Sequence, residues 1–323
     1  MLSDKRTTTD ITKFIAALLV VNGHTFMYYS GMPEAINWLN LGAQCVSLFL
    51  FFSAYGLMCA YEKRGEAYLQ GFIPRRIGRI LIPLVTAYVL SLSVYALFQG
   101  AIDWGNVLST LYWGGPYLKF SWYVTEIAIL YLLFYGCAGR SKSSKQLAMF
   151  LSVGILLLLG LMFLTRQPSW YLNGLPCFVL GIWYQRYETQ LIRIVEKHRS
   201  VLQIGLLLSF LVFFQWRFVK DALPALSAYR YEYVAMYLSN LFFVSLIIIC
   251  INSINRIQLT TRMGGAIYSF YEIYLVQNAV MIAVTSFAFS FWGTWLSIMA
   301  GSVVMGYAMY RINTKISSLI YKQ

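Results

Sequence analysis

The stretch that decides the fold is residues 11–29, ITKFIAALLVVNGHTFMYY, which is almost entirely apolar between Lys13 and His24. A run of this length can cross the hydrocarbon core of a bilayer as one helix. Eleven positions separate Lys13 from His24, or about three helical turns, so both lie on one face about 16 Å apart along the axis. Asp10, three residues before Lys13, shares that face. Ionisable groups inside a membrane span are costly, and they usually indicate a functional site.

The composition extends this interpretation to the whole chain. Hydrophobic residues make up 59% and charged residues 11% of the 323 positions, and the mean hydropathy is +0.63. A soluble domain of this size needs far more surface charge, so we predict an integral membrane protein. No repeat or soluble appendage is visible, and a single transmembrane domain over residues 1–323 is expected. The five cysteines lie in apolar segments without metal-ligand spacing, so no metal site is predicted.

The predicted fold is an all-α bundle of about ten transmembrane helices. The expected spans are residues 11–29, 39–61, 80–98, 120–138, 147–164, 170–186, 201–219, 231–251, 265–286 and 288–311. With both termini in the cytoplasm, only five of the 25 basic residues fall on the outer side; these are Lys119, Arg166, Arg217, Lys220 and Arg230. Such a bias fixes the orientation in a cell membrane and accounts for most of the formal charge of +13 without nucleic acid.

His24 is the first candidate for chemistry. A neutral imidazole can remove a proton from a hydroxyl, which suits a general base. The alternative is a histidine that only ties two helices together through a hydrogen bond. Two further carboxylates, Glu126 and Glu272, fall inside predicted spans. Either of them could orient His24, as the acid does in catalytic pairs, and either could instead satisfy a lysine or a backbone group.

A basic segment, FIPRRIGRILIP at residues 72–83, is the second candidate. On a helix, Arg76 and Arg79 are three residues apart and project together. Paired guanidinium groups suit a phosphate-bearing ligand, with Arg75, Lys13 and Arg6 nearby. The alternative is a membrane anchor that binds lipid headgroups. The outer connection at residues 99–119 is rich in glycine and aromatic residues, so it could form a platform for a sugar or an interfacial loop.

Taken together, these segments resemble the acyltransferase-3 family of membrane O-acyltransferases. The segments are, in chain order, Asp10–Ala17 with Val20–Thr25, Leu48–Leu57, Arg76–Arg79 with Pro83, Trp122–Tyr123 with Tyr131–Leu133, Pro176–Gly181 and Tyr271–Val276. The resemblance implies transfer of a short acyl group, most often acetyl, from cytosolic acyl-coenzyme A to a hydroxyl of a glycan or lipid-linked glycan. It implies that coenzyme A is a substrate and that no cofactor is permanently bound.

The resemblance also implies roles for individual residues. His24 and Glu126 are expected to be catalytic, and Lys13, Arg75, Arg76 and Arg79 are expected to bind the donor. Supporting or orienting roles fall to Asp10, Trp122, Tyr123, Glu272 and Tyr274. The chain departs from the family pattern where Lys13 replaces a frequent arginine and Gln277 replaces a frequent histidine. In one branch, carboxylates follow the tryptophan of the fourth span where Ile127 and Ala128 stand here, one step from Glu126.

Three functions compete at this stage. In the enzyme hypothesis, His24 deprotonates an acceptor hydroxyl that attacks the thioester, or it carries the acyl group itself. A proton-coupled transporter would use Asp10, Lys13, His24 and Glu272 as a relay, but no inverted repeat is visible. A non-enzymatic partner in envelope-polymer assembly would not need His24. The enzyme is the favoured interpretation, and its oligomeric state, including a homo-oligomer, is left open.

Overall fold

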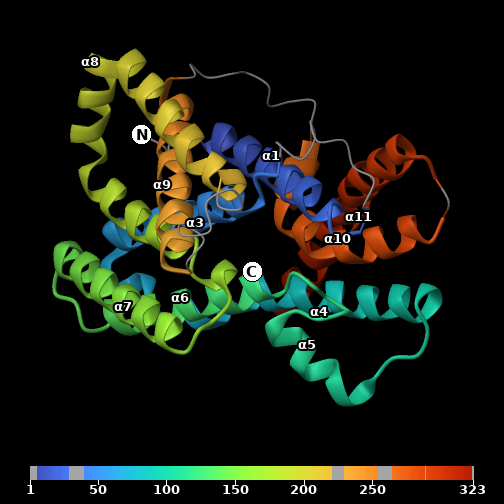
Figure 1. The fold of residues 1–323 in the computed structure, drawn as a ribbon. Helices are drawn as coiled ribbons and strands as arrows, with labels where there is room; N and C mark the ends of the chain where they lie inside the picture. The colour runs from blue at the N-terminus through green and yellow to red at the C-terminus, as the bar shows by residue number, and fades with distance from the viewer. Residues whose placement is uncertain (1–5, 29–39, 220–228, 254–263, 288, 322–323) are drawn as a thin grey trace. The chain divides into compact units, whose positions relative to one another are not determined.

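The computed structural model describes residues 6–28, 40–219, 229–253, 264–287 and 289–321, and every regular element in them is helical (Figure 1). The helices are α1 (Arg6–Thr25), α3 (Gly42–Arg64), α4 (Phe72–Phe98), α5 (Val107–Trp113), α6 (Trp122–Ala138), α7 (Ser144–Leu164), α8 (Leu175–Val219), α9 (Tyr229–Ser253), α10 (Phe270–Thr285) and α11 (Phe291–Ile320). The all-α prediction is therefore confirmed. Outside the described residues lie Lys5, Tyr29, Lys220, Arg256, Arg262 and Lys322, and the side chains of Arg6, Trp113, Arg217 and Arg230.

Six stretches of the described chain are helical, long and apolar enough to cross a membrane. They are Gly42–Tyr68, Phe72–Phe98, Ser144–Leu164, Ser169–Phe214, Tyr233–Asn252 and Gly265–Thr285. Helix α6 is apolar but shorter. A count of about ten spans and cytoplasmic termini stay predictions.

The two predicted spans at residues 170–186 and 201–219 leave residues 187–200 as a connection, and the structure shows that this basic connection, which contains His198, is helical rather than a loop. Residues on both sides of His198 are helical, and α8 continues from Leu175 to Val219 with one break, at His198 (φ −124°, ψ 26°). The charged residues between the two apolar halves thus extend helical turns, because lysine, arginine and glutamate are good helix formers. The predicted spans at residues 170–186 and 201–219 correspond to the two arms of this kinked helix.

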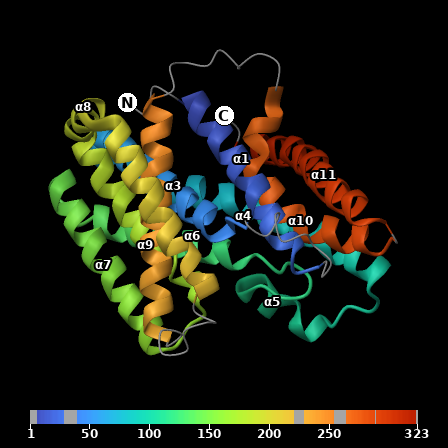
Figure 2. The same ribbon diagram turned by 45° about the horizontal axis from the view of Figure 1, so that its top comes forward.

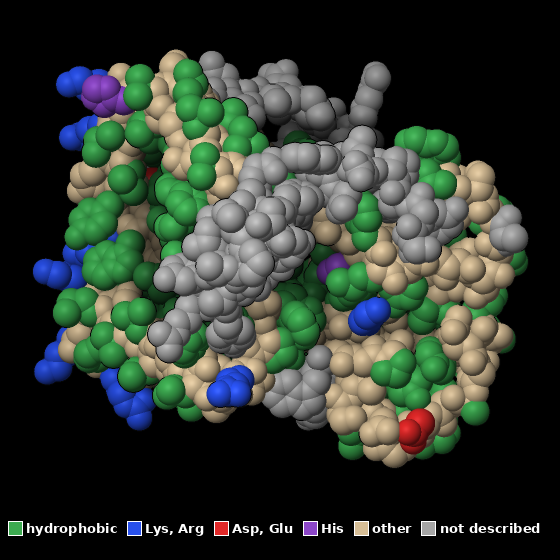
Figure 3. Space-filling model, viewed as in Figure 1, with side chains coloured by type: hydrophobic (Ala, Val, Ile, Leu, Met, Phe, Trp, Pro, Cys, Tyr) green, Lys and Arg blue, Asp and Glu red, His purple; other side chains and the backbone are tan. Residues whose placement is uncertain are grey.

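The described chain divides into two compact units, each assembled from separate stretches of sequence. The first comprises residues 1–9, 46–70 and 133–258, and in it α8 and α9 run side by side (Figures 1 and 2). Its helix α7 exposes Leu156, Leu157 and Leu164 at 63–80%. In Figure 3, lysine and arginine side chains gather along the margin formed by α7 and α8, while apolar side chains cover much of the face. Exposed leucine faces bounded by basic residues fit a lipid environment.

The second unit comprises residues 10–45, 71–132 and 259–323, and it is organised around α10. All residues of α10 from Glu272 to Ile282 are buried, and the helix packs against α4 and α11. Helix α11 approaches very closely, because a Cβ on Gly306 would lie 2.8 Å from the backbone nitrogen of Ile273. Such small-residue contacts are typical of helix pairs in membranes. This unit contains all the predicted site residues.

Helix α4 begins at Phe72, so the basic segment forms its first turns rather than a loop before it. Pro83 lies inside the helix and lacks an N–H for the carbonyl of Arg79. At its far end, α4 is followed by the predicted aromatic connection, which contains α5 and packs back on α4. Tyr88 of α4 hydrogen-bonds to Thr110 at 2.6 Å, and the rings of Tyr95 and Tyr117 are 4.8 Å apart.

Candidate functional site

The last turn of α1 brings His24 against α10, where its ring nitrogen Nδ1 lies 2.9 Å from Oε1 of Gln277. The other end of the Gln277 amide donates to the carbonyl of Tyr274 at 2.7 Å. A carbonyl can only accept, so the amide nitrogen must face Tyr274 and the amide oxygen must face the histidine. Nδ1 of His24 therefore carries the proton, and Nε2 keeps its lone pair. This is the tautomer that a general base needs at Nε2.

The His24 ring is also fixed from one side by Phe120. The two rings stack with centroids 3.6 Å apart and planes within 2°. Phe120 is held in turn by Tyr274, whose hydroxyl donates to the Phe120 carbonyl at 2.6 Å, and Tyr274 contacts the ring of Tyr123 at 5.4 Å. Tyr274 and Tyr123 were predicted to support the site, and the structure places both in this chain of contacts. The imidazole is thus restrained in its plane and in its tautomer.

Neither predicted carboxylate hydrogen-bonds to His24 in the part of the chain that the structure describes. Glu272 accepts from Asn313 of α11 at 3.3 Å, and Asn313 accepts from Thr86 of α4 at 2.8 Å. Glu126 is 1% exposed, and within the described residues its two oxygens have no hydrogen-bond partner. The residue that orients His24 is an amide, Gln277, where a carboxylate was expected. A buried carboxyl without a partner is costly and needs an explanation, so a catalytic role for Glu126 stays a proposal.

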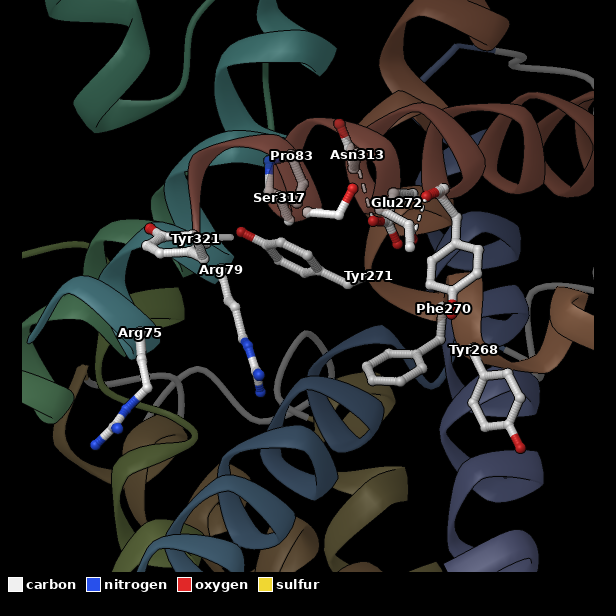
Figure 4. Close-up of a pocket in the computed structure, with 13 residues that line it drawn as sticks. Arg75, Arg79, Pro83, Tyr268, Phe270, Tyr271, Glu272, Asn313, Ser317 and Tyr321 are labelled. Atoms are coloured by element: carbon white, nitrogen blue, oxygen red, sulfur yellow. Dashed lines mark hydrogen bonds between the residues drawn. The ribbon is translucent and has the colours of Figure 1, made fainter. Parts of the chain in front are cut away.

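A cavity of about 640 Å³ opens beside the first turns of α4 and α10 and the last turns of α11. It is lined by Arg75, Arg79, Pro83, Tyr268, Phe270, Tyr271, Glu272, Tyr310, Asn313, Thr314, Ser317, Ser318 and Tyr321. Figure 4 shows the guanidinium groups of Arg75 and Arg79 at one end and Glu272 with Asn313 at the other. The paired arginines are therefore four residues apart on one helix face. Arg76 does not line this cavity, so its predicted pairing with Arg79 in donor binding stays a prediction.

Lys13 and Asp10 lie next to this cavity without lining it. Nζ of Lys13 is 3.7 Å from Oδ1 of Asp10, one turn earlier on α1. The same Nζ lies 5.4 Å from the ring centroid of Phe270, which does line the cavity. Asp10 is buried and Lys13 half-buried, so this charge pair fixes the start of α1 beside the cavity. Trp122, at the start of α6, contacts the ring of Tyr123, with ring centroids 6.3 Å apart.

Helix α10 connects the cavity with the histidine. Its first turn supplies Phe270, Tyr271 and Glu272 to the cavity, and Gln277 holds His24 five residues later. Five residues correspond to about 7.5 Å along a helix axis. A ligand whose anionic end lies at the arginines can thus reach towards His24 along one rigid element. The arrangement thus places a cationic cavity and a proton acceptor along the same helix.

The comparisons with known proteins agree with this arrangement. The model of an acyltransferase domain, that of the acyltransferase-3 family, matches residues 8–311. The chain belongs to the acyltransferase-3 family. The match includes α1, the arginines of α4 and Gln277, so this protein is a membrane acyltransferase. The comparison with curated proteins found no match, and the comparison with solved structures found none.

Several residues of the candidate site were not assigned a role from the sequence. Gln277 was visible only as a departure from the family pattern, and its neighbour Asn278 extends a polar pair inside an apolar helix. That pair is the signal that could have placed α10 against His24, because buried amides need partners. Phe120 and Asn313 gave no signal, since a phenylalanine near a span end and a polar residue near a helix end are common.

Proposed function

We propose that this acyltransferase moves a short acyl group, acetyl in the first instance, from acyl-coenzyme A to a hydroxyl of a cell-envelope glycan or its lipid-linked precursor. The observation that carries the proposal is His24 itself. Its Nδ1 proton is fixed by Gln277, its ring is stacked on Phe120, and within the described residues Nε2 has no hydrogen-bond partner. A base held in this state is ready to take a proton from an alcohol.

The cavity suits the donor. The 3′- and diphosphate groups of coenzyme A carry several negative charges, and Arg75 and Arg79 offer guanidinium groups that bind phosphate oxygens in pairs. Lys13 adds a charge beside Phe270. The thioester arm would then extend along α10 past Tyr274. The Glu272 carboxyl, at the other end of the cavity from the arginines, would disfavour phosphates there and so favours this polarity.

In the reaction, the acceptor hydroxyl attacks the thioester carbonyl while Nε2 of His24 takes its proton. The tetrahedral intermediate collapses, the C–S bond breaks, and the proton passes from His24 to the leaving thiolate. The products are an O-acyl ester and free coenzyme A. In the second route, Nε2 attacks the thioester first, and the acyl-imidazole then passes the acyl group to the acceptor. Both routes need the same tautomer of His24.

The test uses purified protein in nanodiscs, with [acetyl-14C]coenzyme A binding and slow thiol release as separate measurements. We expect His24→Ala to bind the donor and release no thiol above the uncatalysed rate. The Arg75→Ala/Arg79→Ala variant should lose donor binding. The control is Lys142→Ala/Lys145→Ala, which removes two exposed basic residues that do not line the cavity and should match the wild type.

Two results would overturn the proposal. A wild-type protein that neither binds nor hydrolyses any short acyl-coenzyme A has a different donor. A His24→Ala protein that still releases thiol at the wild-type rate has a different catalytic residue. Uptake driven by a proton gradient in sealed vesicles, without thiol release, would favour the transporter instead.

A further inference from the structure

The connection before α6 places a lysine beside the end of α1, next to the residue stacked on His24. Lys119 directly precedes Phe120, the residue stacked on His24. Its Nζ lies 4.9 Å from the ring centroid of Tyr28, one turn of chain beyond His24. The side chain is exposed. Lys119 is also one of the five basic residues that the charge bias places on the outer side, where such residues are rare.

Hydrogen bonds and a close backbone contact hold the segment that carries this lysine in place. The Tyr28 hydroxyl donates to Oδ1 of Asn278, which follows Gln277 on α10, at 2.5 Å. Nδ2 of Asn278 donates to the carbonyl of Tyr117 at 3.0 Å. Gly114, at φ 73°, brings its Cα so close that a Cβ would lie 2.4 Å from the Lys119 carbonyl. The end of α1, α10 and the connection before α6 are thus tied together around the lysine.

The partners of Lys119 leave its charge available. Its side chain contacts the face of an aromatic ring, and within the described residues it forms no ion pair. An ammonium on a tyrosine face keeps its N–H donors free for a second partner. An aromatic face beside a cation is a surface that binds a sugar ring carrying an anionic group. In the proposed function the donor binds at Arg75 and Arg79, beside the first turn of α10, so the Lys119 end of the site is left for the acceptor.

We propose that Lys119 and the Tyr28 ring form an acceptor subsite that selects an anionic glycan, one whose hydroxyl is acylated at His24 and whose carboxylate or phosphate binds the lysine. The inference rests on the proposed acyl transfer and names its acceptor class. Lys119 acts as a specificity-determining residue, with no part in proton transfer. Neutral glycans would contact the ring alone and bind more weakly.

The test compares three soluble acceptors that differ in charge: methyl glucoside, methyl glucuronide and glucose 1-phosphate. Acyl transfer from acetyl-coenzyme A is measured with wild type, Lys119→Gln and Lys119→Arg. We expect the anionic acceptors to have the lower KM with wild type. Lys119→Gln should raise that KM about tenfold, because a charged hydrogen bond is lost, and should leave methyl glucoside unchanged. Lys119→Arg should keep most of the preference.

Thiol release without acceptor separates this proposal from the underlying function. If it is normal in wild type and in Lys119→Gln, while both proteins treat neutral and anionic acceptors alike, the acceptor proposal is overturned and the acyltransferase stands. If Lys119→Gln lowers kcat equally for all acceptors, the lysine stabilises the transition state and the subsite is also refuted. A preference for the glucuronide over the phosphate, or the reverse, identifies the anion.

Discussion

Replacing Gln277 by methionine tests the central geometry of the site. Methionine keeps the length and volume of the side chain but cannot accept a hydrogen bond from Nδ1 of His24. In the wild type this nitrogen lies 2.9 Å from the amide oxygen of Gln277. A buried hydrogen bond of this kind is worth about 1–3 kcal/mol when its partner is removed. If that energy holds the Nδ1–H tautomer, its loss lowers the reactive fraction of His24, and we expect kcat to fall about 5- to 150-fold.

The assay is acetyl-coenzyme A turnover with acceptor, measured over pH 6–9. Gln277 does not line the cavity, so KM for the donor should stay within about twofold of the wild type. Gln277→Glu keeps an acceptor for Nδ1 and should retain more activity than Gln277→Met. In the double variant with His24→Ala, the methionine should add no further loss, because the two residues act as one unit.

Two outcomes would refute this reasoning. Wild-type kcat in Gln277→Met would show that the tautomer is set elsewhere. A large rise in KM for the donor with unchanged kcat would show that Gln277 binds substrate instead. Thermal unfolding in the same nanodiscs checks that the variants are folded.

Three further predictions concern the surroundings of this site. Arg79→Ala should weaken acetyl-coenzyme A binding about tenfold, while Arg76→Ala, outside the cavity, should change it by less than about threefold, as titration calorimetry can show. Gly306→Ala should destabilise the protein by about 1–3 kcal/mol, because its Cβ would overlap the backbone of α10. The control, Gly160→Ala in α7, has open space around the added Cβ and should be neutral or stabilising. Equal shifts of the melting temperature in the two variants would contradict the close contact between α10 and α11. Glu126→Leu should raise stability by about 1–3 kcal/mol by removing a buried carboxyl with no described partner, and should lower turnover; a less stable protein, or full activity, would argue against a functional reason for Glu126.

The helical fold could be predicted from the sequence, and so could the residues that make up the candidate site, because both depend on local signals. A histidine inside an apolar run, and arginines at the start of another, are anomalies that need no knowledge of other helices. The helical turn on which Arg79 lies could be predicted from the spacing of the arginines in residues 72–83. The break in α8 at His198 could not be predicted, because charged residues between two apolar runs are equally compatible with a loop and with a helix.

The partners across helices could not be predicted, because nothing in the sequence says which faces meet. Gln277 and Glu272 lie five residues apart on α10, so they point in different directions: Gln277 towards α1 and Glu272 towards α11. The sequence favoured the charged residue as the partner of His24, since carboxylates are the commoner companions of catalytic histidines. The packing of α1 against α10 places the Gln277 amide beside His24 instead. Likewise, Arg75 rather than Arg76 faces the cavity because α11 covers that side of α4.

The complete burial of α10 has a consequence for handling the protein. Every residue from Glu272 to Ile282 is covered by protein, so the hydrogen bonds that hold His24 never meet lipid or detergent. Changing the solubilising agent should alter the environment of exposed faces such as that of α7, and leave the base and its amide untouched. Differences in activity between one detergent and another would then report how substrates enter, and donor hydrolysis by a purified sample would serve as a measure of an intact catalytic centre.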